Sequence, residues 1–198
     1  MKVLVLGATG MVGSAIVAEG RSRGQDVVTA STRPGAADVV ADVTDTDALT
    51  QLAAGSDAVV ISVPPPRDGS DHQPWVDAHQ RLAATSFPAR LAMVGGAGSS
   101  LVDGARLLES PDFPEMFRAE ASSASTVLDT FRAAATGVDW VILSPAPQIG
   151  PGERTGAYRT GTDNLVGPSI SAEDYAVALW DELEEPQHRR TRFTVANS

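Results

Sequence analysis

The residues with the clearest chemical meaning are three glycines near the start of the chain, Gly7, Gly10 and Gly13. Gly7 allows a preceding strand to turn sharply, Gly10 allows a diphosphate to approach the backbone, and Gly13 allows a following helix to pack closely on a sheet. The unpaired N–H groups at such a helix start, at the positive end of the helix dipole, bind phosphate. The spacing predicts a nucleotide-binding loop; the alternative is a glycine-rich turn of another α/β protein.

A strand and a helix must position this loop, and the flanking sequence supplies both. Residues 3–6 are apolar and favour a strand, and residues 11–23 have the pattern of a helix. We therefore expect cofactor contacts from the loop residues Gly7, Thr9, Gly10, Met11, Val12 and Gly13.

The rest of the chain alternates apolar strands with helical patterns. Strands are predicted over 26–30, 38–42, 57–62, 90–94, 139–143 and 192–195, and helices over 44–54, 75–85, 114–135 and 172–183. Such alternation is typical of a mainly parallel sheet with helices on both faces. The sequence thus predicts one Rossmann-like, doubly wound α/β domain over residues 1–198. Residues 145–198, which begin with a loop-rich insert up to 168, are expected to form the substrate side.

Composition excludes several classes of function. The net charge of −10 argues against nucleic acid and anionic membranes as partners, and no apolar run is long enough to span a bilayer. The chain contains no cysteine, which excludes disulfides and thiolate catalysis, and we expect a cytoplasmic protein without a signal peptide.

The residues after the second predicted strand indicate which dinucleotide binds. An NAD site usually has an acidic residue at this strand end for the ribose 2′-OH, but here the chain has Ala30 and Ser31. Arg33 can instead bind a 2′-phosphate, with hydroxyl donors from Ser31 and Thr32. The sequence therefore favours NADP(H) over NAD(H), unless Arg33 is an ordinary solvated arginine.

Several motifs together resemble a known superfamily. They are GATGMVG at 7–13, VGGAGS at 94–99, SPA at 144–146, PGERTG at 151–156 and ISAEDYA at 170–176. With them the chain resembles, from end to end, the atypical short-chain dehydrogenase/reductase superfamily, and within it the NmrA-like NAD(P)H-binding group of NADH-flavin reductase type. It departs from that group in a shorter turn at 165–168.

The resemblance implies further cofactor contacts. Relatives contact the adenine with the residues that correspond to Asp42 and Val43, although Asp42 could equally cap the next helix. Residues that follow the later strands are expected to border the nicotinamide and its ribose, because ligands lie at the carboxyl ends of the strands. They are Ser62, Val63, Gly95, Gly96, Pro145 and Ala146.

The usual catalytic pair of short-chain dehydrogenases, Tyr-x-x-x-Lys, is missing. The tyrosines are Tyr158 and Tyr175, the residues four places after them are Thr162 and Leu179, and the only lysine is Lys2. The missing pair argues against simple alcohol dehydrogenation, and it leaves a sugar-nucleotide epimerase, which normally needs the same pair, as a third alternative. Two functions are favoured: an NADPH-dependent reductase of a small conjugated acceptor such as a flavin or quinone, or a non-catalytic NADP(H) sensor with a protein partner.

No catalytic residue can be assigned, but the insert offers candidates for the acceptor side. Tyr158, Arg159 and Arg154 are placed near the acceptor by the resemblance and by their position in the chain; the alternative is ordinary hairpin surface. The glycine-rich insert is expected to close over the nicotinamide as a lid, rather than to form a fixed hairpin. A metal site is not expected, because the spacing of Asp71, His72, Asp77 and His79 matches no ligand motif.

Overall fold

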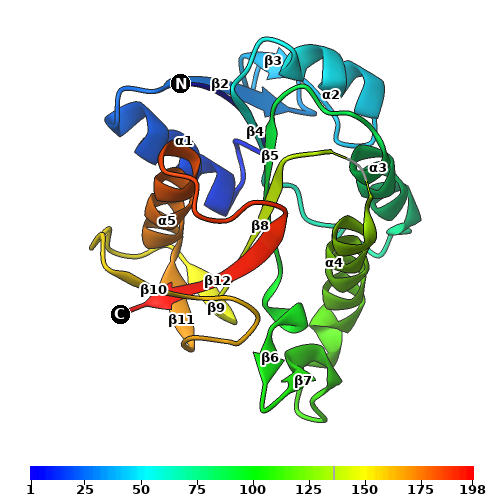
Figure 1. Ribbon diagram of the computed structural model, residues 1–198, viewed down its shortest axis with the longest axis vertical. Helices are drawn as coiled ribbons and strands as arrows, with labels where there is room; N and C mark the ends of the chain where they lie inside the picture. Colours follow the sequence, from blue (N-terminus) through cyan, green and yellow to red (C-terminus); the bar gives the residue numbers. More distant parts are fainter. Residues whose placement is uncertain (136) are drawn as a thin grey trace.

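The protein is built around an eight-stranded sheet, shown in Figure 1. The computed structural model describes residues 1–135 and 137–198. The strands of this sheet are β1 (Lys2–Leu6), β2 (Asp26–Ser31), β3 (Val39–Val40), β4 (Ala58–Ile61), β5 (Arg90–Val94), β8 (Trp140–Pro145), β10 (Tyr158–Gly161) and β12 (Thr191–Asn197).

Strand order fixes where a ligand can bind. The order is β10-β12-β8-β5-β4-β1-β2-β3, and all neighbours are parallel except β10 and β12. The chain first winds outward from β1 to β2 and β3, then crosses back to β4 on the other side of β1. Such a reversal leaves a crevice at the carboxyl ends of the strands, where open α/β sheets bind their ligands.

Helices cover both faces of the sheet, as predicted. Alternate residues of a strand point to opposite faces, so Val3 and Val5 join the core beneath α1 and α5, while Leu4 and Leu6 join the core beneath the other helices. The bounds are α1 (Met11–Ser22) and α5 (Ala172–Glu184) on one face, and α2 (Thr46–Ala53), α3 (Gln73–Ala84) and α4 (Glu115–Ala133) on the other.

Close contact between α1 and α5 fixes the direction of α1. A Cβ atom at Gly20 would lie 2.1 Å from Cζ2 of Trp180, so only glycine fits. The indole Nε1 of Trp180 donates a hydrogen bond to the carbonyl of Ile16 at 2.7 Å. This packing holds the second half of α1 against α5.

Two regions expected to be irregular contain further short elements. The insert at 145–168 includes β10 and a strand that pairs in parallel with a segment just before α5, and the region before α4 contains a hairpin and two 3-10 turns. In contrast, the strand predicted over 38–42 is reduced to β3, because the chain turns at Asp42. The added elements are β6 (Leu101–Val102), β7 (Ala105–Arg106), β9 (Gln148–Gly150), β11 (Ser169–Ser171), η1 (Ala97–Ser99) and η2 (Leu107–Glu109).

Candidate functional site: a dinucleotide site at the carboxyl edge of the sheet

The loop between β1 and α1 has the geometry that its glycines predict. Gly7 has a φ of 75°, and a Cβ atom there would lie 2.2 Å from the carbonyl oxygen of Ser62. A Cβ atom at Gly13 would lie 2.0 Å from the carbonyl oxygen of Gly7. At Gly10 the nearest atom would be 3.3 Å away and belongs to the loop itself. Two glycines therefore pack the loop, and the third leaves its backbone open.

The open side of the loop presents backbone donors. Thr9, Gly10 and Met11 are exposed, and the first hydrogen bond of α1 runs from the N–H of Ser14 to the carbonyl of Gly10 at 2.8 Å. The N–H groups of Met11, Val12 and Gly13 precede that bond, so the helix itself offers them no acceptor. They are the donors that the glycine spacing predicts for a diphosphate, and diphosphate binding by them stays a prediction.

Arg33 lies next to this loop. Its Nη2 donates to the hydroxyl of Thr9 at 3.1 Å, and its backbone N–H donates to the Ser31 hydroxyl at 3.2 Å. An acidic residue, Asp38, lies nearby, but its carboxylate accepts from the N–H and hydroxyl of Thr29 at 2.9 and 2.7 Å. Arg33 and two hydroxyl groups thus lie together between the end of β2 and the glycine loop.

The predicted adenine contacts lie after β3. The Asp42 carboxylate accepts from the N–H and hydroxyl of Thr44, both at 2.8 Å, while Asp45 caps α2 by accepting from the N–H of Ala48 at 3.0 Å. The alternative role of Asp42 as the helix cap is therefore wrong. Val43 is buried in the core.

The predicted nicotinamide contacts follow neighbouring strands. Ser62 and Val63 follow β4, Gly95 and Gly96 follow β5, and Pro145 with Ala146 ends β8 and begins the next loop. Because β1, β4, β5 and β8 are adjacent and parallel, the structure brings these residues to the same edge as Gly7. The backbone N–H of Ser62 donates to the carbonyl of Leu6 at 3.0 Å, which joins the two halves of the edge.

The candidate acceptor residues of the insert bind other parts of the protein. Arg154 forms a two-point ion pair with the buried Glu19 of α1 at 2.6 and 2.8 Å. The hydroxyl of Tyr158 donates to Asp181 of α5 at 2.5 Å, and Arg159 donates to the carbonyl of Asn197.

These contacts also act on the ionisation of the phenol. Burial, and then the hydrogen bond to Asp181, raise the pKa of Tyr158 above its usual range. A catalytic tyrosine of a short-chain dehydrogenase needs the opposite shift, since a nearby lysine lowers its pKa. Contact of Arg154, Tyr158 and Arg159 with an acceptor remains untested, whereas their observed partners give them a structural role.

Asp174 fastens the insert to α5. Its carboxylate, at 0% exposure, accepts from the N–H groups of Thr155 and Gly156 at 2.8 Å each, from the Thr155 hydroxyl and from the amide of Asn197. Burial alone would raise the pKa of Asp174, but these hydrogen bonds outweigh it and lower the pKa. Such anchoring favours a fixed insert over a mobile lid.

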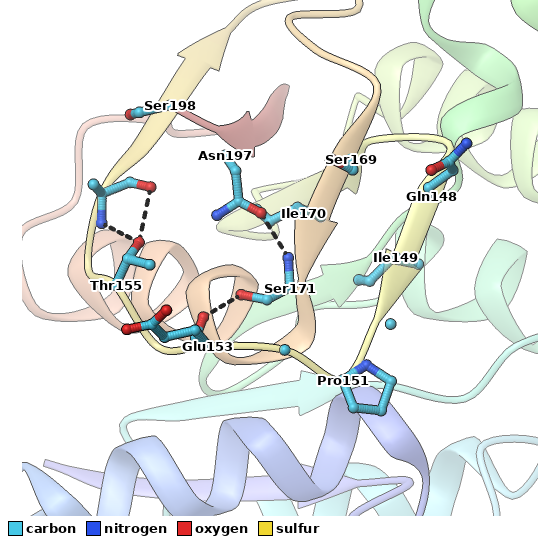
Figure 2. A pocket seen from close by; sticks show the side chains of 13 residues that line it. Gln148, Ile149, Pro151, Glu153, Thr155, Ser169, Ile170, Ser171, Asn197 and Ser198 are labelled. Atoms are coloured by element: carbon cyan, nitrogen blue, oxygen red, sulfur yellow. Dashed lines mark hydrogen bonds between the residues drawn. The ribbon is translucent and has the colours of Figure 1, made fainter.

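A surface cavity of about 680 Å³ is lined by the first part of this insert, by β11 and by the last two residues of the sequence (Figure 2). Hydrogen bonds from the N–H of Ser171 to the side-chain oxygen of Asn197 and from the Ser171 hydroxyl to the carbonyl of Glu153 join residues that line it. The residues predicted to contact the cofactor do not line it. A second hollow of about 550 Å³ lies between α1 and the insert and includes Met11, Arg154 and Glu173.

Sequence analysis missed one feature close to the predicted nicotinamide contacts. Arg67, which follows the prolines after β4, forms a two-point ion pair with Glu120 of α4 at 2.8 and 2.6 Å. Ala124, one helical turn after Glu120, lies 3.4 Å from a Cβ atom placed at Gly96. In the sequence, the i, i+4 spacing of Glu120 and Ala124 indicates only that they share one face of a helix. Nothing in the sequence shows which loops this face contacts.

Within the described residues, no cluster of three or more histidine or acidic side chains could hold a metal ion. The helices of the same residues are also too short or too polar to cross a membrane.

The sheet order and the glycine loop define a Rossmann-type dinucleotide-binding domain. The family of proteins described as NAD(P)H-binding matches residues 7–186, so the chain belongs to this family and binds a nicotinamide cofactor. This finding, together with similar solved structures, agrees with the resemblance to atypical short-chain dehydrogenases/reductases.

Individual relatives match over the whole chain. YwnB of Bacillus subtilis, named as an uncharacterized protein, is 35% identical, and the match covers 100% of this chain and 99% of YwnB. A solved structure from Streptococcus pneumoniae, named a "putative NADH-flavin reductase", is 31% identical with a TM-score of 0.84 and coverage of 100% of both chains. A "putative exported protein" from Burkholderia pseudomallei is 34% identical with a TM-score of 0.85, covering 99% of each chain.

Proposed function

We propose that the protein is an NADPH-dependent reductase that transfers hydride to a planar conjugated acceptor, such as a flavin or a quinone. The observation that carries the proposal is that other groups of the protein engage the hydroxyls of both tyrosines. Tyr158 is bound to Asp181, and the fully buried Tyr175 donates to the carbonyl of Leu143 at 2.7 Å. Lys2 begins β1, at the end of the strand opposite the glycine loop.

A conjugated acceptor suits a site without a protein acid. Reduction of a simple ketone creates an alkoxide that must be protonated in the transition state, whereas a flavin or quinone spreads the incoming charge over its ring system. When bound, NADPH supplies the hydride, and the acceptor takes its proton from water. The chain's own residues then contribute binding, orientation and exclusion of water.

Preference for NADPH over NADH is part of the proposal. Support comes from Arg33, which lies beside Thr9 and Ser31 at the end of β2. An NAD site usually has an acidic residue at this strand end, and such a residue would repel a 2′-phosphate, whereas an arginine can bind it. The diphosphate is held by the first-turn N–H groups of α1, and the remaining predicted contacts border the nicotinamide.

The decisive experiment is a steady-state screen of the purified protein with NADPH and NADH. We expect oxidation of NADPH by FMN, riboflavin or menadione, and no oxidation of simple secondary alcohols with NADP⁺. Efficient alcohol oxidation would contradict the proposed function, since it needs an acid–base group that this site does not contain.

A non-catalytic NADP(H) sensor is the second candidate, favoured by the same engagement of both tyrosines. Tight NADPH binding without turnover of any acceptor, together with a protein partner captured only in one redox state, would support it. A cytoplasmic location remains a prediction that cell fractionation can test.

A further inference from the structure

The segment after β4 packs against α4, and α4 in turn lies next to Gly96, one of the predicted nicotinamide contacts. Arg67 and Glu120 join the two parts, and the ring nitrogens of His72 lie 2.9 Å from the Ser123 hydroxyl and 2.9 Å from the carbonyl of Pro66. The loop of residues 64–72 is thus held against α4 at several points.

The same helix reaches the second glycine loop. A Cβ atom placed on Gly98 would lie 2.7 Å from the Cβ of Ala121, and one placed on Gly96 would lie 3.4 Å from that of Ala124. Phe117 occupies the same helical face one turn earlier, because residues three, four and seven apart align. Its side chain is 48% exposed although it is a large aromatic. An exposed aromatic residue therefore lies on the α4 face that packs against the second glycine loop.

Arg67 is held in one orientation and still has donors to offer. Glu120 accepts from its Nε and Nη2, while its Nη1 makes no hydrogen bond within the described part of the chain. The Arg67 side chain is 68% exposed, and that of Glu120 is 25% exposed. A guanidinium fixed on one side by a carboxylate can bind a phosphate or a second carboxylate from its other side.

We propose that the acceptor carries an anionic side chain, which Arg67 binds while the planar ring of the acceptor lies against Phe117. This inference rests on the proposed reductase function, since it describes the acceptor of the same reaction. Aromatic stacking is tolerant of ring identity, so Phe117 selects for planarity, and Arg67 selects for charge.

The test compares two flavins with the same ring, FMN with a phosphate and riboflavin without one. We expect the wild-type kcat/KM with NADPH to be about ten-fold higher for FMN, the effect of one charge-assisted hydrogen bond. Arg67→Gln should bring FMN down to the riboflavin value and leave riboflavin unchanged. Arg21→Gln is the matched control, because Arg21 is a similarly exposed arginine that faces Asp38, and it should change neither flavin.

Two further variants separate binding from a structural role. In Glu120→Gln, the carboxylate no longer neutralises Arg67, so kcat/KM for FMN should rise several-fold while that for riboflavin stays constant. A purely structural ion pair predicts the opposite, namely that Glu120→Gln and Arg67→Gln cause similar losses for both flavins. Phe117→Ala should lower kcat/KM for both flavins about equally, whereas Leu52→Ala, which removes an exposed side chain from α2, should not.

Equilibrium binding makes failure of the two proposals distinguishable. Flavin fluorescence in the presence of NADP⁺ measures the affinity for FMN and riboflavin without turnover. If both flavins are reduced but Arg67→Gln affects them equally, the inference is overturned and the reductase function stands. If FMN binds more tightly than riboflavin through Arg67 but neither is reduced, the reductase function falls and the anion site stands. If neither flavin is reduced and neither binds, both proposals are overturned.

Discussion

The loop between β1 and α1 and the segment at 151–158 both lie beyond strand ends, and they differ in where their polar groups point. In the loop, the N–H groups at the start of α1 and the exposed Thr9 face outward, with Arg33 alongside. In the segment, Arg154 is paired with Glu19, and Asp174 accepts from Thr155. The first region leaves backbone donors without an acceptor in the helix, and the second uses its polar groups for hydrogen bonds inside the protein.

This difference shows that the type of residue after a strand is not enough to identify a ligand site. In the sequence, an arginine and a tyrosine in a glycine-rich insert indicate ligand binding as much as three spaced glycines do. The insert residues are held in place by buried carboxylates on α1 and α5, and such pairs lose most when one member is removed. The predictions below test whether the loop is the ligand site and the segment a structural clamp.

The largest effect is expected for Gly7→Ala, compared with Gly24→Ala. Both glycines have a positive φ, 75° and 73°, but a Cβ atom meets the Ser62 carbonyl at Gly7 and nothing within 4 Å at Gly24. Gly24→Ala should cost about 1–2 kcal/mol for its backbone conformation alone. Gly7→Ala should cost at least about 4 kcal/mol and abolish NADPH binding. Urea unfolding and calorimetric titration measure both; equal losses in the two variants would refute the close packing of the loop.

The second prediction concerns the clamp. Asp174→Ala leaves the buried donors of Thr155 and Gly156 without an acceptor, so the free energy of unfolding should fall by about 2–4 kcal/mol. Affinity for NADPH should not change in the folded fraction. Asp112→Ala, at an exposed position before α4, is the control and should cost less than about 0.5 kcal/mol. A large loss of cofactor affinity in Asp174→Ala would place the segment in the ligand site.

The third prediction concerns the cofactor side. Arg33→Ala should weaken NADPH binding by about 1.5–3 kcal/mol and leave NADH binding almost unchanged, because only NADPH has the 2′-phosphate. Stability in urea should be preserved, since Arg33 is exposed. Calorimetric titration with both cofactors measures this, and equal wild-type affinities for NADPH and NADH would remove the argument for Arg33.

Stability should depend on pH through the clamp. The hydrogen bond from Arg154 lowers the pKa of Glu19 despite its burial, and hydrogen bonds also lower the pKa of Asp174. A lowered pKa in the folded state stabilises the protein above the unfolded pKa of about 4, and this stabilisation is lost as the pH falls through the folded value. Urea midpoints should therefore drop below about pH 4.5, and Glu19→Gln should make that drop shallower. An unchanged slope would mean that the ion pair does not stabilise the fold.

Sequence alone was sufficient for the parallel strands of the sheet and for its glycine loop, because both depend on local patterns. The apolar run at residues 3–6, the glycine spacing and the missing acid after the second strand are each visible within a short stretch. Glu19 carried no such signal, since it is one acidic residue in a helix whose partners, Arg23 and Arg154, lie four and 135 residues away.

The acceptor side was less predictable for the same reason. The pairing of Arg67 with Glu120 joins two segments 53 residues apart, and only the packing of α4 across the ends of β4 and β5 brings them together. Short strands such as β9 and β11 were also missed, because pairing between distant segments, rather than local propensity, creates them.

The smallest effect is expected for Tyr158→Phe, which removes the hydroxyl that donates to Asp181 and nothing else. Asp181 keeps its hydrogen bond from Arg23 at 2.8 Å, so the loss of stability should be about 1 kcal/mol or less. If the tyrosine acted as a proton donor, its removal would lower kcat by about 10²-fold or more. We expect kcat and KM for NADPH and FMN to stay within about two-fold of wild type, a change of less than about 0.5 kcal/mol in the barrier. A large fall in kcat with little change in stability would return Tyr158 to the acceptor site and show that a clamp residue also serves the reaction.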